Sequence, residues 1–137
     1  MIQLKSRKEI ELIARGGRII ADLFTEIGPR VKPGVSTGEL DAFAEEFIQS
    51  HDGAVPAFKG LYGFPGSVCA SVNDQVVHGI PSRKVRLKEG DILSIDVGVR
   101  LQGWCSSRSI LSKPAARPSH RSSVPGRAAV SFSFRVV

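Results

Sequence analysis

The stretch LKEGDILSIDVGVR, residues 87–100, decides the fold of this chain. After a turn over residues 87–90, apolar and polar side chains alternate through residues 91–100, which is the period-two pattern of a β-strand with one apolar face. The two faces carry Leu93, Ile95, Val97 and Val99 on one side and Ser94, Asp96 and Gly98 on the other. The pattern therefore predicts a strand that packs one face against the rest of its domain and leaves Asp96 on the other.

The strand runs into residues 101–105, LQGWC, which have the form of a tight hairpin turn. With the turn centred on Leu101-Gln102, residue 107 lies directly opposite Asp96 on the same face, with Cβ atoms about 4.5–5.5 Å apart. Two carboxylates placed in this way would both reach a pair of metal ions about 3.5–4 Å apart. Position 107, however, is Ser.

Two amphipathic helices precede the strands. Apolar residues recur at three- and four-residue spacing through residues 6–27 and 37–51, and each segment opens with Ser followed three residues later by Glu, the spacing of a capping box. Residues 67–72 suit a second strand, and residues 76–78 a third, short one. Helices followed by paired strands predict an α+β unit within the broader α/β class.

The chain changes character at residue 107. All 13 acidic residues and 13 of the 19 basic residues lie in residues 1–106, whose charges cancel, so the net charge of +6 belongs to residues 107–137. These last 31 residues hold eight Ser, five Arg and three Pro without a helical stripe. We expect one domain over residues 1–106, followed by a Ser/Arg/Pro-rich basic tail that is disordered or is the product of a shifted reading frame.

The composition excludes several classes of protein. A hydrophobic content of 42% is ordinary for a globular domain, and no apolar run is long enough to span a bilayer. The N-terminus has no hydrophobic signal core, and two cysteines, Cys69 and Cys105, are too few for a secreted disulfide scaffold. We therefore expect a cytoplasmic protein with reduced thiols and no membrane partner.

Asp96 and His78 are the candidates for chemistry. A lone Asp in an apolar strand is as often a solvent-facing residue as a functional one. A His beside Gly79 is more often an ordinary loop histidine than a catalytic one. The strand that carries Asp96 is the one place in the sequence that offers His78 a site, but the spacing alone leaves both interpretations open.

Two motifs add a family resemblance. Residues 63–81, GFPGSVCASVNDQVVHGIP, resemble the substrate-side signature of the type I methionine aminopeptidases, and residues 87–98 resemble the strand that bears the first metal-binding Asp of that family. The two opening helices match in order and spacing, so the resemblance covers residues 1–106. It implies the N-terminal half of a pita-bread (creatinase/aminopeptidase) fold, which the family builds from two related halves.

The resemblance also implies a function. Methionine aminopeptidases are metallo-exopeptidases, hydrolases that remove the initiator methionine from nascent polypeptides close to the ribosome. They use two divalent ions (Co, Mn, Fe or Zn) that are held by two Asp, one His and two Glu. Asp96 matches the first of these Asp ligands, and His78 matches the histidine that contacts substrate and steadies the transition state. Phe58, Phe64 and Cys69 match the lining of the methionine pocket, whereas Leu61 stands where an aromatic residue is common.

The departures from the family pattern bear on activity. Ser107 replaces the second metal-binding Asp, no Asp or Glu occurs after Asp96, and the one later histidine, His120, lies outside any family motif. One carboxylate of five ligands does not hold two metal ions with useful affinity. We therefore expect a truncated and frame-shifted form, with the break between Ser106 and Arg108, that binds metal unstably and is catalytically inactive.

Two further expectations complete the sequence-based picture. The rival function is a non-catalytic pita-bread module that binds peptides or proteins, with a basic tail that contacts RNA or the ribosome. The resemblance to a two-halved fold also predicts that the apolar side of strand 91–99 is partly uncovered, which would make the body marginally stable and prone to form dimers or aggregates.

Overall fold

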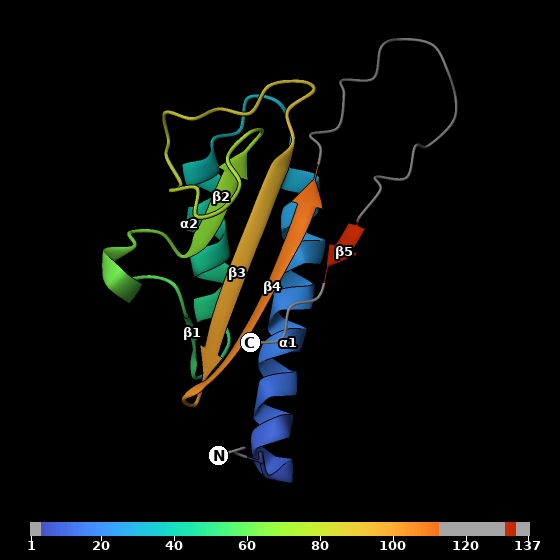
Figure 1. The fold of residues 1–137 in the computed structure, drawn as a ribbon, viewed down its shortest axis with the longest axis vertical. Helices are drawn as coiled ribbons and strands as arrows, with labels where there is room; N and C mark the ends of the chain where they lie inside the picture. Colours follow the sequence, from blue (N-terminus) through green and yellow to red (C-terminus); the bar gives the residue numbers. More distant parts are fainter. Residues whose placement is uncertain (1–3, 113–130, 134–137) are drawn as a thin grey trace.

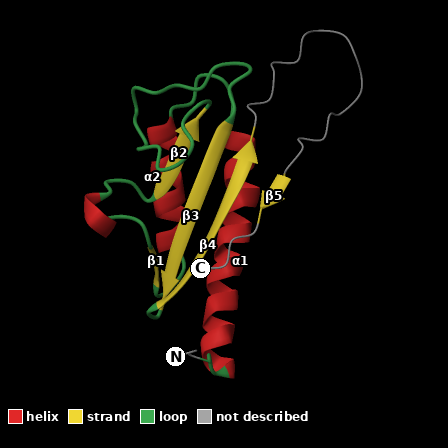
Figure 2. Cartoon of the chain, viewed as in Figure 1, coloured by secondary structure: helices red, strands yellow, loops and turns green. Residues whose placement is uncertain are grey.

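The computed structural model describes residues 4–112 and 131–133. This part of the chain forms two helices and five strands, joined by turns and by a long loop between Val72 and Leu93 (Figures 1 and 2). The elements in order are α1 (Arg7–Ile27), the 3-10 turn η1 (Gly28–Arg30), α2 (Thr37–Gln49), β1 (Ala54–Pro56), the 3-10 turn η2 (Leu61–Gly63), β2 (Val68–Val72), β3 (Leu93–Leu101), β4 (Trp104–Ser112) and β5 (Ser131–Ser133).

β3 is the centre of an antiparallel sheet, as the alternation in residues 91–100 predicts. One edge of β3 pairs along its whole length with β4, and β5 adds to the far side of β4 through Ser109–Leu111. The other edge is shared by two short strands, with β2 against Leu93–Val97 and β1 against Val99–Leu101. Figure 1 shows β1 and β2 placed end to end beside the long β3.

Both helices cover the same face of this sheet, and the core lies between them. α1 packs on β3 and β4, while α2 packs on β1 and β2. The apolar residues of β3 that face the helices, Leu93, Ile95, Val97 and Val99, are all 0–1% exposed. The prediction that this face is partly uncovered is therefore wrong, because these side chains are buried in the core between the sheet and the two helices.

α1 approaches β4 closely at one point. Gly16 lies against Ser106, whose hydroxyl donates a 2.7 Å hydrogen bond to the Ile13 carbonyl, and a Cβ at position 16 would come within 2.8 Å of the Ser106 Oγ. The absence of a side chain at Gly16 thus lets the helix and the strand touch.

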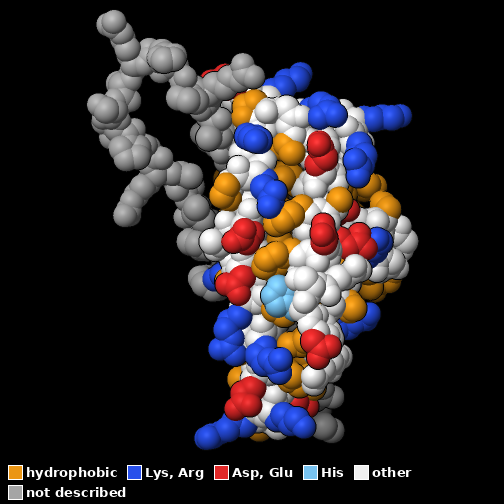
Figure 3. Space-filling model, turned by 180° about the vertical axis from the view of Figure 1, so that it is seen from behind, with side chains coloured by type: hydrophobic (Ala, Val, Ile, Leu, Met, Phe, Trp, Pro, Cys, Tyr) orange, Lys and Arg blue, Asp and Glu red, His pale blue; other side chains and the backbone are white. Residues whose placement is uncertain are grey.

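Seen from behind the sheet (Figure 3), the outer surface mixes acidic and basic side chains, in keeping with the balanced charge of residues 1–106.

The structure differs from the sequence-based picture in three details. The hairpin turn centres on Gln102-Gly103, since both residues have positive φ (50° and 87°) and Leu101 pairs with Trp104. This is the backbone of a two-residue hairpin turn, in which Gly is favoured. The register is consequently shifted: Ser109 lies opposite Asp96, and Ser107 lies opposite Gly98. Ser107 remains on the same face as Asp96, but diagonally across from it.

A second difference concerns the end of β4. This strand continues to Ser112, six residues beyond the domain boundary that the sequence predicts at residue 106. The reason is that the ladder with β3 holds residues 107–112 in extended form whatever their side chains. Residues 113–130 and 134–137, which contain the rest of the predicted disordered tail, lie outside the described residues.

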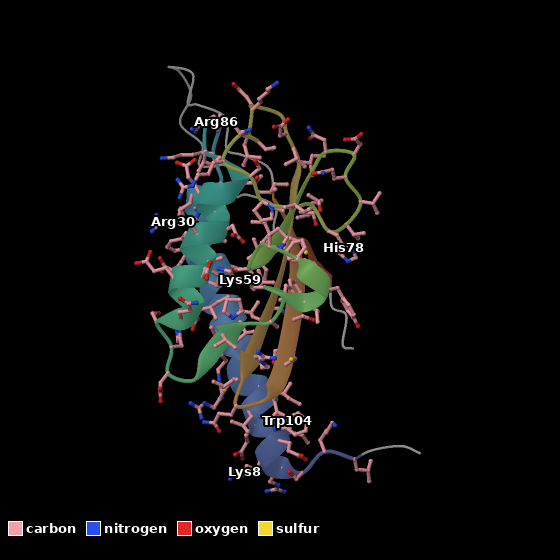
Figure 4. The ribbon with its side chains drawn as sticks, turned by 90° about the vertical axis from the view of Figure 1, so that its left-hand side faces the viewer. Lys8, Arg30, Lys59, His78, Arg86 and Trp104 are labelled. Atoms are coloured by element: carbon pink, nitrogen blue, oxygen red, sulfur yellow. The ribbon has the colours of Figure 1, made fainter. Side chains whose placement is uncertain are left out.

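The third difference concerns residues 76–78, which do not form the predicted short strand. Residues 73–81 leave the sheet as a loop in which Val76 and Val77 are 85% and 65% exposed. His78 has φ 57°, a left-handed conformation that no strand residue adopts. In the side view of Figure 4, His78 lies on the opposite side of the sheet from the helices.

Candidate functional site

A cavity of about 440 Å³ opens on the face of the sheet that the helices leave free. Two loops frame it, one leading from β1 into β2 and the other from β2 towards β3. Most of its lining is apolar, and the polar side chains are a carboxylate, an imidazole, a thiol and a phenol. The lining residues are Phe58, Leu61, Tyr62, Gly63, Phe64, Pro65, Cys69, His78, Ile80 and Asp96.

Asp96 enters the cavity from the middle of β3. The alternation of the strand turns it away from the helices, and Cys69 of β2 is its direct neighbour across the ladder. Burial raises the pKa of the Asp96 carboxyl above its usual range, while hydrogen bonds from the Ser109 hydroxyl and the Val97 backbone N–H act in the opposite direction, as does the charge of His78. Ser109 is thus the polar partner that β4 supplies to this carboxylate.

Cys69 forms part of the wall beside Asp96. It is 6% exposed, and burial raises the pKa of its thiol to about 11, with further contributions from the negative charges of Asp96 and Asp41. A thiol with this pKa stays protonated at neutral pH and is a poor nucleophile. Cys69 therefore contributes a small apolar surface to the cavity rather than a reactive group.

His78 reaches the cavity from the loop of residues 73–81. The structure brings His78 and Asp96, which are 18 positions apart in the sequence, to the lining of a single cavity. The imidazole is exposed to solvent, so an incoming ligand can contact it. Phe58, Phe64 and Cys69, the residues predicted to line a substrate pocket, line the same cavity together with Leu61.

The described residues do not provide a metal site. Residues 4–112 and 131–133 contain no group of three or more His, Cys, Asp or Glu side chains close enough to hold a metal ion. Asp96 is the one carboxylate in the cavity lining, and Ser107, two residues along β4 from the position opposite Asp96, carries a neutral hydroxyl. A dinuclear centre requires carboxylates that bridge its ions, so this donor set does not fit one.

The loop between β1 and β2 is held by α2. The Asp41 carboxylate accepts hydrogen bonds from the backbone N–H of Ser67 at 2.7 Å and of Val68 at 2.9 Å, and Lys59 forms a salt bridge with Glu45. Burial raises the pKa of Asp41, although these two backbone hydrogen bonds act in the opposite direction. The helix thereby fixes both ends of the loop that carries Phe58 and Phe64.

Sequence reasoning missed three contributors to the site. Ser109 was assigned to the tail, and only the observed register places it beside Asp96. Gly98 has no side chain because Phe58 occupies that space: a Cβ there would lie 2.6 Å from the Phe58 Cε1. Ile80 lines the cavity, although the sequence analysis gave it no role beyond its place in the motif of residues 63–81. No local pattern reveals these roles, because each depends on a contact with a distant part of the chain.

Comparisons with known proteins give one family and several relatives. Residues 11–114 match the model of metallopeptidase family M24. The chain is 53% identical over 106 residues to a methionine aminopeptidase of Clostridium perfringens, with 77% of the chain and 42% of that protein covered. It is 50% identical over 104 residues to methionine aminopeptidase 1 of Bacillus subtilis, with 76% and 41% covered. The chain thus spans about two fifths of the length of these curated relatives.

Solved structures give the same result. The crystal structure of methionine aminopeptidase from Rickettsia prowazekii superposes with a TM-score of 0.77 at 40% identity, over 81% of this chain and 44% of that one. The enzyme from Thermotoga maritima gives a TM-score of 0.80 at 33% identity, over 83% and 45%. A prolidase from Pyrococcus furiosus, at 20% identity and a TM-score of 0.71, shares the fold.

Proposed function

The chain belongs to metallopeptidase family M24, and from this premise we propose that its residues form the substrate-binding side of a methionine aminopeptidase without the metal centre needed for hydrolysis. The observation that carries the proposal is the cavity. It combines apolar walls with His78 and Asp96, but offers a single carboxylate where the family depends on divalent metal ions.

The shape and lining of the cavity favour the side chain of an N-terminal methionine. Phe58, Phe64 and Cys69 supply aromatic and sulfur-containing surface, against which a flexible thioether packs well. His78 lies at the cavity with its imidazole accessible, and we propose that its ring N–H donates a hydrogen bond to the first peptide carbonyl of the bound chain. Neither the apolar lining nor His78 cleaves a peptide bond by itself, so the proposed activity of these 137 residues is peptide binding.

The metal requirement of the family is not met by this donor set. We propose that neither Co, Mn, Fe nor Zn binds stably to these residues, because Asp96 alone cannot satisfy four or more coordination positions. Restoring a carboxylate at position 107 would give two donors on one face, which still falls short of the set that the family uses. We derive no hydrolytic step for this chain.

Enzyme assays and peptide titration together test the proposal. With Co(II), Mn(II), Fe(II) or Zn(II), the purified chain should release no methionine from a Met-Ala-Ser peptide above a control without protein. The same peptide should perturb the NMR signals of cavity residues, and an Asp-Ala-Ser peptide should not, because its side chain carries a charge into an apolar wall. Turnover that Asp96→Ala abolishes would contradict the lack of a metal centre, and equal binding of both peptides would contradict the methionine pocket.

The partners follow from the same proposal. We propose that the ligand is the N-terminus of a nascent polypeptide, met in the cytoplasm near the ribosome. Among residues 4–112 and 131–133, no helix combines the length and the apolarity that crossing a membrane requires.

The rival function is a non-catalytic module that binds peptides or proteins. It shares the cavity and the lack of turnover with the proposed function. It differs in predicting binding that does not depend on an N-terminal methionine, which the two peptides above distinguish.

A further inference from the structure

The His78 end of the loop of residues 73–81 is fastened to β2 through Gly79, whereas Gln75 holds the other end to Val72. The Gly79 carbonyl accepts a 2.8 Å hydrogen bond from the Ala70 backbone N–H, and the Gly79 N–H donates a 3.0 Å hydrogen bond to the Ser71 hydroxyl. Gly79 is buried, whereas His78 and Ile80 on either side of it are exposed. Around His78, the loop therefore meets the sheet through one buried residue between two exposed ones.

Only glycine fits at this attachment point. A Cβ at position 79 would overlap the Ala70 carbonyl and would lie 2.7 Å from the Ser71 Cα, both of which are backbone atoms that cannot move aside. The backbone of Gly79 thus rests directly on the backbone of β2. Two hydrogen bonds, one to each side of the residue, fix its orientation as well as its position.

The two residues next to Gly79 in the sequence form part of the cavity lining. His78 and Ile80 both line it, and His78 does so in a left-handed conformation with φ 57°. A residue with a Cβ holds such a conformation only where surrounding contacts impose it. The two hydrogen bonds of Gly79, the residue next to His78, are contacts of this kind.

We propose that Ser71 is a positioning residue, whose hydroxyl holds His78 in the cavity by fixing Gly79. Ser71 is 4% exposed and is not part of the cavity lining, so it acts through the loop and not on a ligand. The role rests on the proposed function, in which His78 contacts the bound peptide. The Ala70 hydrogen bond alone would leave the N–H side of Gly79, the side that joins it to His78, without a tether.

Ser94 provides a matched control. It lies directly opposite Ser71 across the β2–β3 ladder and points to the same face of the sheet. Among the described residues, its hydroxyl makes no hydrogen bond to the loop of residues 73–81. Ser94→Ala therefore removes the same chemical group from the same face and leaves Gly79 attached.

Amide hydrogen exchange and NMR spectra of the full chain test the proposal. In Ser71→Ala, exchange of the Gly79 amide should be about tenfold faster, the factor expected for the loss of one ordinary hydrogen bond. The His78 and Ile80 signals should shift, and the one-bond Cα–Hα coupling of His78 should move away from the value typical of positive φ. Ser94→Ala should leave all of these unchanged. Ser71→Cys keeps an acceptor atom at the same place in the side chain but a weaker one, so it should give the same changes in smaller degree.

The outcomes separate this role from a merely structural one. If Ser71→Ala and Ser94→Ala shift the His78 signals equally, or if neither shifts them, Ser71 does not position His78. If Ser71→Ala does not fold, Ser71→Cys decides, since wild-type exchange of Gly79 in that variant would overturn the proposal. A chain in which Ser71 holds His78 but no peptide binds would contradict the proposed function alone.

Discussion

At the scale of single residues, the cavity shows how the environment sets the chemistry of a side chain. Cys69 and Asp96 face each other across the β2–β3 ladder, and burial raises the pKa of each. The Cys69 thiol is therefore a neutral part of the cavity wall. The Asp96 carboxylate, by contrast, is stabilised in its charged form by the Ser109 hydroxyl and by the charge of His78. Two groups that could both ligate a metal ion in another setting thus have different roles here.

The two cysteines should differ sharply in reactivity. Cys69 is buried with a pKa of about 11, so roughly fewer than one thiol in a thousand is ionised at pH 7.5, whereas Cys105 is exposed. Iodoacetamide at this pH should therefore label Cys105 and leave Cys69 unmodified until the chain unfolds. Mass spectrometry of the tryptic peptides measures both sites, and 6 M guanidinium provides the control in which both react. Equal labelling of the folded chain would show that the cavity wall is not packed as described.

At the scale of elements, both helices begin with the same device. Ser6 and Ser36 each accept a hydrogen bond from the N–H of a Glu three residues later, and each Glu carboxylate accepts one from the backbone N–H of its Ser. The two boxes differ in setting: Ser36 is 0% exposed and contacts the segment of residues 82–87, whereas Ser6 is open to solvent. The same local signal is therefore expected to contribute differently to stability.

Ser36→Ala should lower the free energy of unfolding by about 1–2 kcal/mol, the upper range for loss of an N-cap, because the part-buried Glu39 backbone N–H loses its acceptor and the Glu39 carboxylate loses the Ser36 hydroxyl as a donor. Ser6→Ala, as the matched control, should cost about 0.5 kcal/mol, since water replaces the exposed hydroxyl. Urea denaturation followed by circular dichroism measures both. Equal losses in the two variants would contradict the role of burial at the second cap.

The cap of α2 also predicts a pH dependence. Hydrogen bonds from the Ser36 hydroxyl and backbone N–H hold the pKa of Glu39 below its usual value, with a smaller contribution from the charges of Arg86 and Arg83. Because the folded pKa is the lower one, this stabilisation is present above the unfolded pKa and is lost as the pH falls through the folded pKa. The cost of Ser36→Ala should consequently shrink in acid.

At the scale of the whole molecule, the two sides of the sheet differ in how well their apolar side chains are buried. The helices bury the apolar face of β3, but the loops on the other side expose large apolar side chains. On the two loops that frame the cavity these are Leu61 (52%), Tyr62 (101%), Val76 (85%), Val77 (65%) and Ile80 (59%). Apolar surface gathered in this way favours association between molecules.

We therefore expect the chain to form dimers or larger species as its concentration rises. Changing Val76 and Val77 together to Ser should weaken this association, because both side chains are exposed and lie outside the core. Ile10→Ser, which removes an exposed apolar side chain from α1, is the control and should have no effect. Sedimentation velocity measures the distribution. A chain that remains monomeric at all accessible concentrations, with a sharp thermal transition, would contradict the expectation.

The sequence by itself determined the elements that have a local period or a local signal. The capping boxes located the starts of both helices, and the alternation in residues 91–100 predicted β3 and the side on which Asp96 lies. These predictions succeed because burial that repeats along an element produces a matching repeat of apolar and polar residues in the sequence. The family motifs added His78 and the apolar lining, which the structure brings to one cavity.

Only the tertiary structure decided how these elements meet. The positive φ of Gln102 and Gly103 set the register that places Ser109 beside Asp96, and the β3–β4 ladder carried the body on to Ser112. The attachment of Gly79 to Ala70 and Ser71 turned a predicted strand at residues 76–78 into the loop that presents His78. Each of these outcomes depends on hydrogen bonds between residues that are distant in the chain or on one backbone angle. Neither a long-range hydrogen bond nor a single backbone angle produces a periodic pattern in the sequence.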